Sequence, residues 1–171
     1  NGSGFYAYYD GTNIMFRFRN GGYSTGSRGY SVLIDTDLKI GKTGFYADPN
    51  YVAPSASRSG NPGFELEIVY EGNKRIAVYN VDGTVTGTLV ASYSLNTHSQ
   101  VSVALTKTSN NADYFTDFGV PVSILGNPQY IRIVGPTVNS AASALGGNAS
   151  DVFGISDLPK KNLENNWKII V

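Results

Sequence analysis

Cysteine is absent from the chain of 171 residues, and histidine, methionine and tryptophan each occur once. Without a thiol there is no disulfide, no thiolate zinc site, no iron–sulfur cluster and no cysteine nucleophile. The single histidine, His98, excludes every metal site that needs several imidazoles, and it lies in the polar run 96–100. The sequence also has no P-loop and no glycine motif that opens a helix. These absences predict a protein that is not an enzyme.

The chain also has no net charge, because 13 basic residues balance 13 acidic ones. Only 15% of its residues are charged. Nucleic acids and anionic membranes attract proteins with a basic excess, so neither is an expected partner. No apolar run approaches the roughly 18 residues that span a bilayer, so we expect no membrane insertion. Abundant Gly, Asn, Ser, Thr and Tyr is typical of extracellular or cell-surface β-domains. The chain begins at Asn1, and we expect that any signal peptide has been removed.

Hydrophobic residues that are present recur mostly with period two, which indicates β-strands. Ile14, Phe16 and Phe18 alternate with Met15, Arg17 and Arg19, and Asp10-Gly11 before them suits a tight hairpin turn. Similar patterns predict about nine or ten strands, at 5–9, 14–19, 30–34, 64–70, 75–81, 89–95, 101–107, 114–120, 130–134 and 163–171. One helical turn is expected at 121–125, and 141–145 is either helix or loop. The spacing favours an all-β, jelly-roll-like antiparallel sandwich.

Residues 38–63 form a long segment rich in Gly and Pro. Long loops without strands inside a domain are uncommon and often functional. Too few strands precede this segment for an independent fold, so we interpret it as a loop within one module that spans residues 1–171. We expect that module to belong to a larger extracellular protein, with neighbouring domains among its partners.

Acidic residues follow the predicted strand 30–34. Asp35 and Asp37 stand at its end, and Asp48 lies further along the loop. Alternate carboxylates that enter a loop with glycine suit calcium, which takes six to eight oxygen ligands. An EF-hand is rejected, since Lys39 replaces the third acidic position and no Glu stands at the twelfth. A solvated acidic turn is the alternative to a calcium site.

Glu65 and Glu67 share one face of the predicted strand 64–70. Three interpretations remain open for this pair. In the first, both side chains face solvent. In the second, one of them, which we assign as Glu65, completes the cation site. In the third, the two form an acid/base pair like that of a glycosidase.

Tyrosines are concentrated in the first third of the chain. Tyr46 and Tyr51 lie in the long loop and Tyr23 lies in an earlier glycine-rich loop. A Tyr ring has a flat apolar face and a polar tip, which suits stacking on sugars, although strand tyrosines also pack well in sheets. We assign Tyr23, Tyr46 and Tyr51 as candidate ligand-binding residues and Trp167 to packing.

A methionine and a histidine together can ligate haem. Nothing in the sequence places Met15 near His98, so we assign them no such role.

Two stretches of the sequence resemble a known superfamily. The run 8–18, YYDGTNIMFRF, followed by 29–37, GYSVLIDTD, is similar to the opening of DOMON-like sandwiches, which include the family nine carbohydrate-binding modules. The segment 113–121, DYFTDFGVP, looks like a late strand of that superfamily. The segment 61–68, NPGFELEI, looks like parts of large secreted and surface proteins of Bacteroidetes.

The resemblance implies a jelly-roll-like sandwich that is usually a non-catalytic module. It matches Asp35 and Asp37 to the acidic strand end beside a bound calcium, and Glu65 more weakly. Sugar-binding members of the family nine modules clamp sugar between two tryptophans, and this chain has only Trp167. Their mode of sugar binding therefore does not transfer.

The first functional hypothesis is a calcium-stabilised, non-catalytic extracellular module for a carbohydrate or surface polymer. The alternative is a structural or adhesive spacer of a large surface protein with no small ligand other than calcium. The third is an enzyme that acts on polysaccharides through carboxylates such as Glu65 and Glu67.

Overall fold

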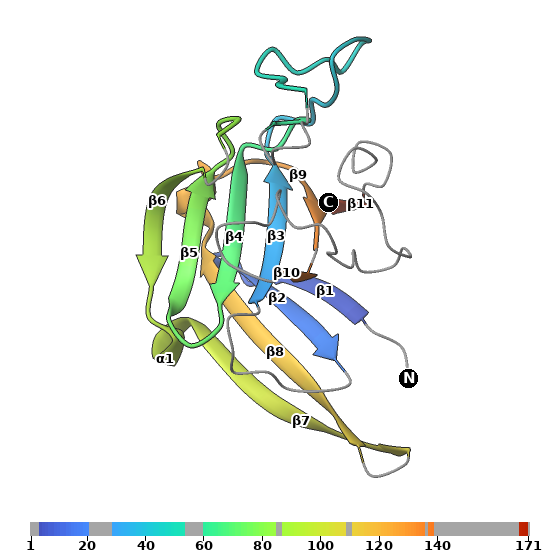
Figure 1. Cartoon of the computed structure of the whole chain (residues 1–171), viewed down its shortest axis with the longest axis vertical. Helices are drawn as coiled ribbons and strands as arrows, with labels where there is room; N and C mark the ends of the chain where they lie inside the picture. The colour runs from blue at the N-terminus through green and yellow to red at the C-terminus, as the bar shows by residue number, and fades with distance from the viewer. Residues whose placement is uncertain are drawn as a thin grey trace.

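The computed structural model of the chain contains two antiparallel β-sheets that pack face to face, which confirms the predicted all-β sandwich (Figure 1). Eleven strands are present in the part of the chain that the structure describes, slightly more than the sequence predicts. The residues described are 4–20, 29–53, 60–84, 87–108, 111–135, 137–138 and 168–170. Tyr23, Trp167 and the segment 141–145 lie outside them.

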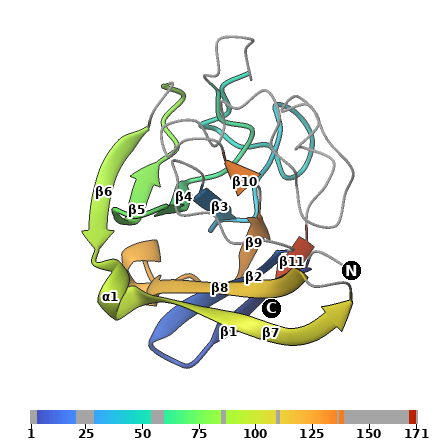
Figure 2. The ribbon, with the colours of Figure 1, turned by 60° about the horizontal axis from the view of Figure 1, so that its bottom comes forward.

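The smaller sheet has four strands in the order β1-β2-β8-β7, so β1 and β7 are its edges. The strands are β1 (Gly4–Tyr9), β2 (Asn13–Asn20), β8 (Asn111–Pro121) and β7 (Ser99–Thr108). The β1–β2 turn forms as the sequence predicts, because the Asp10 carboxylate accepts from the backbone N–H groups of Thr12 and Asn13. Gly11 supplies the positive φ of +96° that this turn requires. Figure 2 shows this sheet from below, with β7 and β8 in front.

The larger sheet is built around β3, which pairs with β4 on one side and with β9 and β10 on the other. The strand order is β11-β9-β3-β4-β5-β6. The strands are β3 (Gly29–Asp35), β4 (Leu66–Glu71), β5 (Arg75–Asn80), β6 (Thr88–Tyr93), β9 (Ile131–Val134), β10 (Thr137–Val138) and β11 (Lys168–Ile170). Strand β11 lies in the predicted final strand.

Two short helical segments connect the sheets. The helical turn expected at 121–125 is present as the 3₁₀ helix η1 (Val122–Leu125). The α-helix α1 (Leu95–His98) joins β6 to β7 and is not predicted from the sequence. Its first turn forms because the Ser94 side chain accepts a hydrogen bond from the backbone N–H of Asn96, as an N-cap residue does.

The core lies between the two sheets and is dominated by phenylalanine and β-branched residues. Alternation along β2 turns Ile14, Phe16 and Phe18 inward, as predicted, where the last two are at most 1% exposed. Phe118 of β8 packs against both rings, with centroids 5.8 Å and 5.7 Å away. Burial of such rings supplies much of the hydrophobic stabilisation of a sandwich core.

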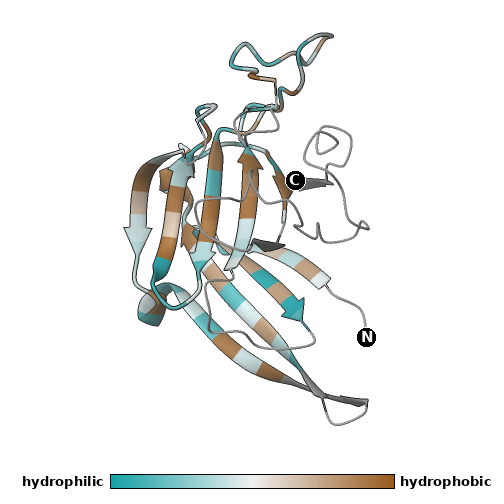
Figure 3. Cartoon of the chain, in the orientation of Figure 1, coloured by the Kyte–Doolittle hydropathy of each residue, from teal (hydrophilic) through white to brown (hydrophobic). Residues whose placement is uncertain are grey.

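The second face of the larger sheet is also buried, which the sequence does not predict. Leu33, Val69 and Ala77 point away from the sandwich core and are fully buried, and this is why β3, β4 and β5 are hydrophobic along most of their length (Figure 3). Glu67 lies on the same face and is only 7% exposed. The interpretation that places Glu67 on a solvent face is therefore wrong.

The loop after β3 is anchored to the start of β4. The backbone N–H of Gly41 donates to the carbonyl of Pro62, and Val52 pairs with Asn61 in an isolated β-bridge. Asn61 is buried, and its side-chain oxygen accepts from the backbone N–H groups of Gly63 and Phe64. A Cβ atom at Gly63 would lie 2.7 Å from the carbonyl oxygen of Lys39, so only glycine permits this approach. The loop is thereby held beside the acidic end of β3.

Candidate functional site

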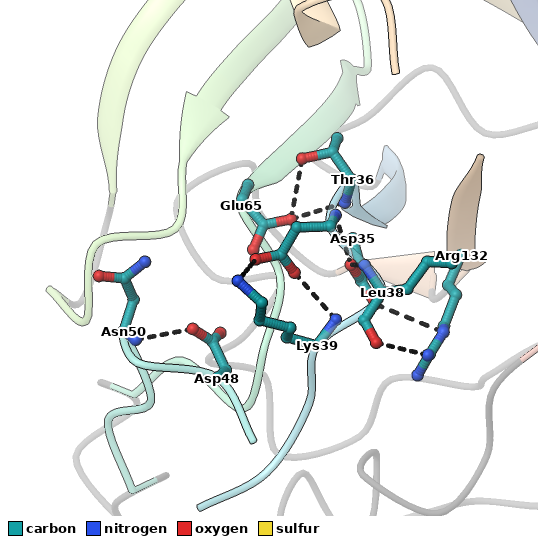
Figure 4. A network of polar contacts seen from close by, with 9 residues as sticks. Asp35, Thr36, Leu38, Lys39, Asp48, Asn50, Glu65 and Arg132 are labelled. Carbon is teal, nitrogen blue, oxygen red and sulfur yellow. Dashed lines mark hydrogen bonds and ion pairs between the residues drawn. The ribbon is translucent and has the colours of Figure 1, made fainter. Parts of the chain in front are cut away.

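Three carboxylates meet where β3 ends and β4 approaches (Figure 4). Asp35 is the last residue of β3, Asp37 follows in the turn, and Glu65 immediately precedes β4. One oxygen of each carboxylate lies within 4.8 Å of one oxygen of each of the others. We call Asp35, Asp37 and Glu65 the acidic cluster, and such a group of oxygens could hold a metal ion.

Hydrogen bonds fix the direction of each carboxylate. Asp35 Oδ1 accepts from the backbone N–H groups of Asp37 and Leu38, at 3.0 and 2.7 Å, which shapes the turn. Leu38 adopts a positive φ of 60°, unusual for a branched side chain. Glu65 Oε2 accepts from the backbone N–H and the hydroxyl of Thr36. Each carboxylate therefore keeps a second oxygen that these backbone bonds do not use.

Burial makes the negative charges of the acidic cluster costly. Burial, together with the negative charges of Asp37 and Asp35, raises the pKa of Glu65 to about 7, although the hydrogen bonds from Thr36 act to lower it. Burial likewise raises the pKa of Asp35 to about 6. Asp35 is fully buried, and its Oδ2 atom accepts no hydrogen bond. A cation among these oxygens would relieve both the repulsion and the unmet hydrogen-bonding capacity.

Two basic side chains already border the acidic cluster. Lys39 places its Nζ atom 3.2 Å from Asp37 Oδ2, in a half-exposed pair. Arg132 of β9 lies opposite Asp35 in the sheet, with its Nε atom 3.6 Å from Asp35 Oδ2. Three carboxylates against two cations leave one uncompensated negative charge when all are ionised, which favours a further cation.

Asp48, the fourth predicted cation ligand, is not a member of the acidic cluster. Its Oδ1 atom accepts from the backbone N–H of Asn50 at 2.6 Å, and its Oδ2 atom is buried without a hydrogen bond. The structure thus brings together three of the four predicted ligands and gives Asp48 a role in its own turn.

The outer face of the four-stranded sheet carries a second polar group, arranged in a row across all four strands. Tyr6 of β1 lies opposite Arg17 of β2, Arg17 lies opposite Asp117 of β8, and Asp117 lies opposite Gln100 of β7. Strands about 4.8 Å apart make such a row roughly 14 Å long. We call this the Tyr6–Gln100 row.

The Tyr6–Gln100 row is tightly hydrogen-bonded at its centre. Arg17 donates from Nε and Nη2 to the two oxygens of Asp117, both at 2.7 Å, and Gln100 donates to Asp117 Oδ2 at 2.9 Å. Burial raises the pKa of the Asp117 carboxyl, but the bonds from Arg17 and Gln100 outweigh this effect and the pKa is lowered. The carboxylate and the guanidinium are therefore charged, paired and held in place.

Aromatic and other large side chains flank the Tyr6–Gln100 row on both sides. On one side, Tyr8 lies opposite Met15, and Met15 lies opposite Gly119. On the other, Phe115 packs under the guanidinium of Arg17, 4.8 Å from ring centroid to Cζ. A Cβ atom at Gly119 would lie 2.6 Å from the backbone carbonyl oxygen of Ile14 and 2.9 Å from Met15 Cγ, so glycine permits β2 and β8 to approach closely here.

The result is an outer groove of about 820 Å³, lined by the Tyr6–Gln100 row and its neighbours. Tyr6 and Tyr8 are 56% and 64% exposed, although both belong to a regular strand. These two large rings therefore lie on the surface of the sheet rather than in the core, and exposed apolar patches of this kind often mark interaction sites.

Two of the three tyrosines assigned from the sequence, Tyr46 and Tyr51, lie outside this groove. Tyr46 is 57% exposed and packs edge-on against Phe45, which is 93% exposed, with ring centroids 5.0 Å apart. The guanidinium of Arg132 lies 5.8 Å from the Tyr46 ring. Tyr51 is partly buried, and Tyr23 lies outside the described residues. The exposed pair Phe45–Tyr46 therefore forms a second aromatic surface, beside the acidic cluster.

Met15 and His98 both line the outer groove, although nothing in the sequence places them together. The His98 ring packs against Tyr93 with centroids 4.5 Å apart, and its Nδ1 atom lies 2.8 Å from the Thr97 hydroxyl. His98 is thus held at the end of α1, at the β7 edge of the groove.

Comparisons with known proteins give no match among protein-family models, curated proteins or solved structures. Within the described residues, no helix has the length and apolar character needed to cross a bilayer.

Sequence reasoning misses the residues that depend on strand pairing. Arg132 reaches the acidic cluster only because β9 pairs with β3, and Asp117 meets Arg17 only because β8 pairs with β2. A usable signal exists for the outer groove, since Tyr6, Tyr8, Arg17 and Asp117 all occupy the polar phase of alternating strands.

Proposed function

We propose that the chain is a calcium-stabilised, non-catalytic extracellular module that binds carbohydrate, or a similar surface polymer, in the outer groove. The proposal agrees with the resemblance to DOMON-like sandwiches and with the composition. Partners are then the glycan and the neighbouring domains of a larger protein.

The observation that carries the proposal is the alternation of apolar and polar surface in the outer groove. A sugar ring presents C–H faces and hydroxyl edges within one unit. The exposed rings of Tyr6 and Tyr8 can cover C–H faces, while Arg17, Asp117 and Gln100 supply fixed donors and acceptors for hydroxyls. Because the polar side chains are already oriented by one another, little side-chain entropy is lost on binding.

Calcium is the cation that best suits the acidic cluster. All its side-chain ligands are carboxylate oxygens, no imidazole or thiolate stands among them, and the adjoining loop offers backbone carbonyls. Calcium would join the end of β3 to the start of β4 through Asp35 and Glu65. Its proposed role is therefore to stabilise the loop that follows β3.

The carboxylates considered for catalysis have other uses. Glu67 is buried and accepts a hydrogen bond from the Ser31 hydroxyl at 2.7 Å, and Glu65 belongs to the acidic cluster. In the outer groove, the Asp117 carboxylate is paired with Arg17 and also accepts a hydrogen bond from Gln100. This pattern supports a binding role rather than acid/base chemistry.

The experiment is a glycan-array screen followed by calorimetric titration of the best ligand. We expect dissociation constants in the micromolar range or weaker, about −8 kcal/mol or less in magnitude, since the rings are exposed. Tyr6→Ala and Tyr8→Ala should each weaken binding about tenfold if they stack on the sugar, whereas Tyr46→Ala should not change it. Tyr46→Ala is the matched control, because Tyr46 is as exposed as Tyr6.

Two other outcomes of this experiment have a defined meaning. Loss of binding in Tyr46→Ala but not in Tyr6→Ala would move the carbohydrate site to the Phe45–Tyr46 surface. No binding to any glycan of the panel would favour the second candidate function, a structural or adhesive spacer. The observation that favours a spacer is the extensive burial of both faces of the larger sheet.

A further inference from the structure

We propose that the outer groove selects uncharged glycans over acidic ones, and that Asp117 determines this choice by neutralising Arg17. The inference rests on the proposed function, because it names the chemical class of carbohydrate that the same groove accepts. It depends on how the charges of the groove are paired.

Each arginine in the lining of the outer groove already forms an ion pair with a carboxylate. Arg17 gives two N–H groups to Asp117, and Arg19 donates to Asp113 from Nε and Nη2, at 3.0 and 2.5 Å. The described lining residues include no lysine and no other arginine. The bidentate pair of Arg17 with Asp117 and the ion pair of Arg19 with Asp113 therefore cancel the positive charge that would attract an acidic sugar.

An acidic sugar would meet specific obstacles at the Tyr6–Gln100 row. Its carboxylate could not use the Nε and Nη2 N–H groups that bind the two oxygens of Asp117, and the positive charge of Arg17 is already neutralised by that carboxylate. It would also lie close to the Asp117 carboxylate, whose negative charge is maintained by Arg17 and Gln100. Like charges brought together in an interface oppose binding strongly.

A neutral sugar meets none of these obstacles. Arg17 is 45% exposed at its side chain, and its Nη1 atom is not used in the bonds to Asp117. The two N–H groups of Nη1 and the second N–H of Nη2 remain as donors, and a donor at Nη1 suits a hydroxyl, which needs only a single hydrogen bond. Phe115 holds the guanidinium plane from one side, so this donor keeps a fixed position.

The test compares one neutral hexasaccharide, the best ligand from the glycan screen, with the same hexasaccharide oxidised to carboxylates at C6. Calorimetric titration is performed with wild type, Asp117→Asn, the double variant Arg17→Met/Asp117→Asn, and Asp82→Asn. Asp82 is exposed in the turn after β5, and its replacement makes the same change of side chain and charge outside the groove. Thermal unfolding checks that each variant is folded.

Wild type should bind the neutral hexasaccharide at least about tenfold more tightly than the oxidised one, as expected for a charge without a partner. Asp117→Asn removes the carboxylate that neutralises the Arg17 guanidinium, so the preference should shift toward the oxidised sugar by about tenfold. The double variant, which lacks this guanidinium, and Asp82→Asn should both keep the wild-type preference. Equal or tighter binding of the oxidised sugar by wild type would overturn the inference, as would an unchanged preference in Asp117→Asn, while leaving the proposed function intact. Absence of binding to every neutral glycan would overturn the proposed function, and this inference with it.

Discussion

Replacing Glu65 with Gln should stabilise the protein when no calcium is present. Burial raises the pKa of Glu65 from 4.5 to about 7, so the folded state holds this proton more tightly than the unfolded state. As pH rises from 4.5 toward 7, the unfolded state loses the proton first, and stability therefore falls through this window. At pH 8 a shift of this size corresponds to roughly 3 kcal/mol of destabilisation. Gln carries no such charge, and its carbonyl oxygen can still accept from Thr36.

The assay is thermal unfolding followed by circular dichroism, in chelator and in calcium, at pH 4.5 and pH 8. In chelator at pH 8, Glu65→Gln should raise the melting temperature by about 6–12 °C, given roughly 2–4 °C per kcal/mol for a chain of this size. At pH 4.5 the variant and wild type should differ little. Calcium should reverse the order at pH 8, because the cation needs the ionised carboxylate. A lower melting temperature for Glu65→Gln in chelator at pH 8 would refute the reasoning.

Three further predictions concern calcium and catalysis. Asp35→Asn keeps the acceptor for the turn but removes a charge, so a tenfold excess of calcium over its dissociation constant, worth about 1.4 kcal/mol in wild type, should no longer raise the melting temperature; a full calcium response in this variant would exclude Asp35 as a ligand. Calcium affinity, measured by titration calorimetry, should fall as pH drops from 8 to 5, because Glu65 and Asp35 bind protons over that range; a constant affinity would argue against both residues. Polysaccharides and aryl glycosides should not be turned over, and turnover lost in Glu65→Gln or Glu67→Gln with the fold intact would show an enzyme.

Local patterns were sufficient to predict most of the sandwich. The alternation at 14–19 correctly assigns Phe16 and Phe18 to the core, and Asp10-Gly11 correctly predicts the first turn. Asp35 and Asp37 could be predicted as cation ligands from the sequence, because two carboxylates two positions apart at the end of one strand lie close together whatever the distant strands do. The closeness of Glu65 depends in addition on the pairing of β4 with β3, two strands that follow each other along the chain.

The remaining features depend on which strands pair. Arg17 and Asp117 are 100 positions apart, and only the register of β2 against β8 places one opposite the other. Burial of Glu67 requires a sheet covered on both faces, which alternation on one strand cannot reveal. The helix α1 has only four residues, too short for a periodic pattern, and its Ser94 cap is not distinctive in a chain rich in serine.

The central claim is that carbohydrate binds on the outer face of the four-stranded sheet. The most direct measurement is the mapping of backbone amide chemical shifts while the best neutral glycan of the screen is titrated into the labelled protein. The account predicts that the largest shifts fall on β1, β2, β8 and β7 around Tyr6, Arg17, Asp117 and Gln100. Shifts concentrated instead on the loop that holds Phe45 and Tyr46, or no shifts with any glycan, would contradict it.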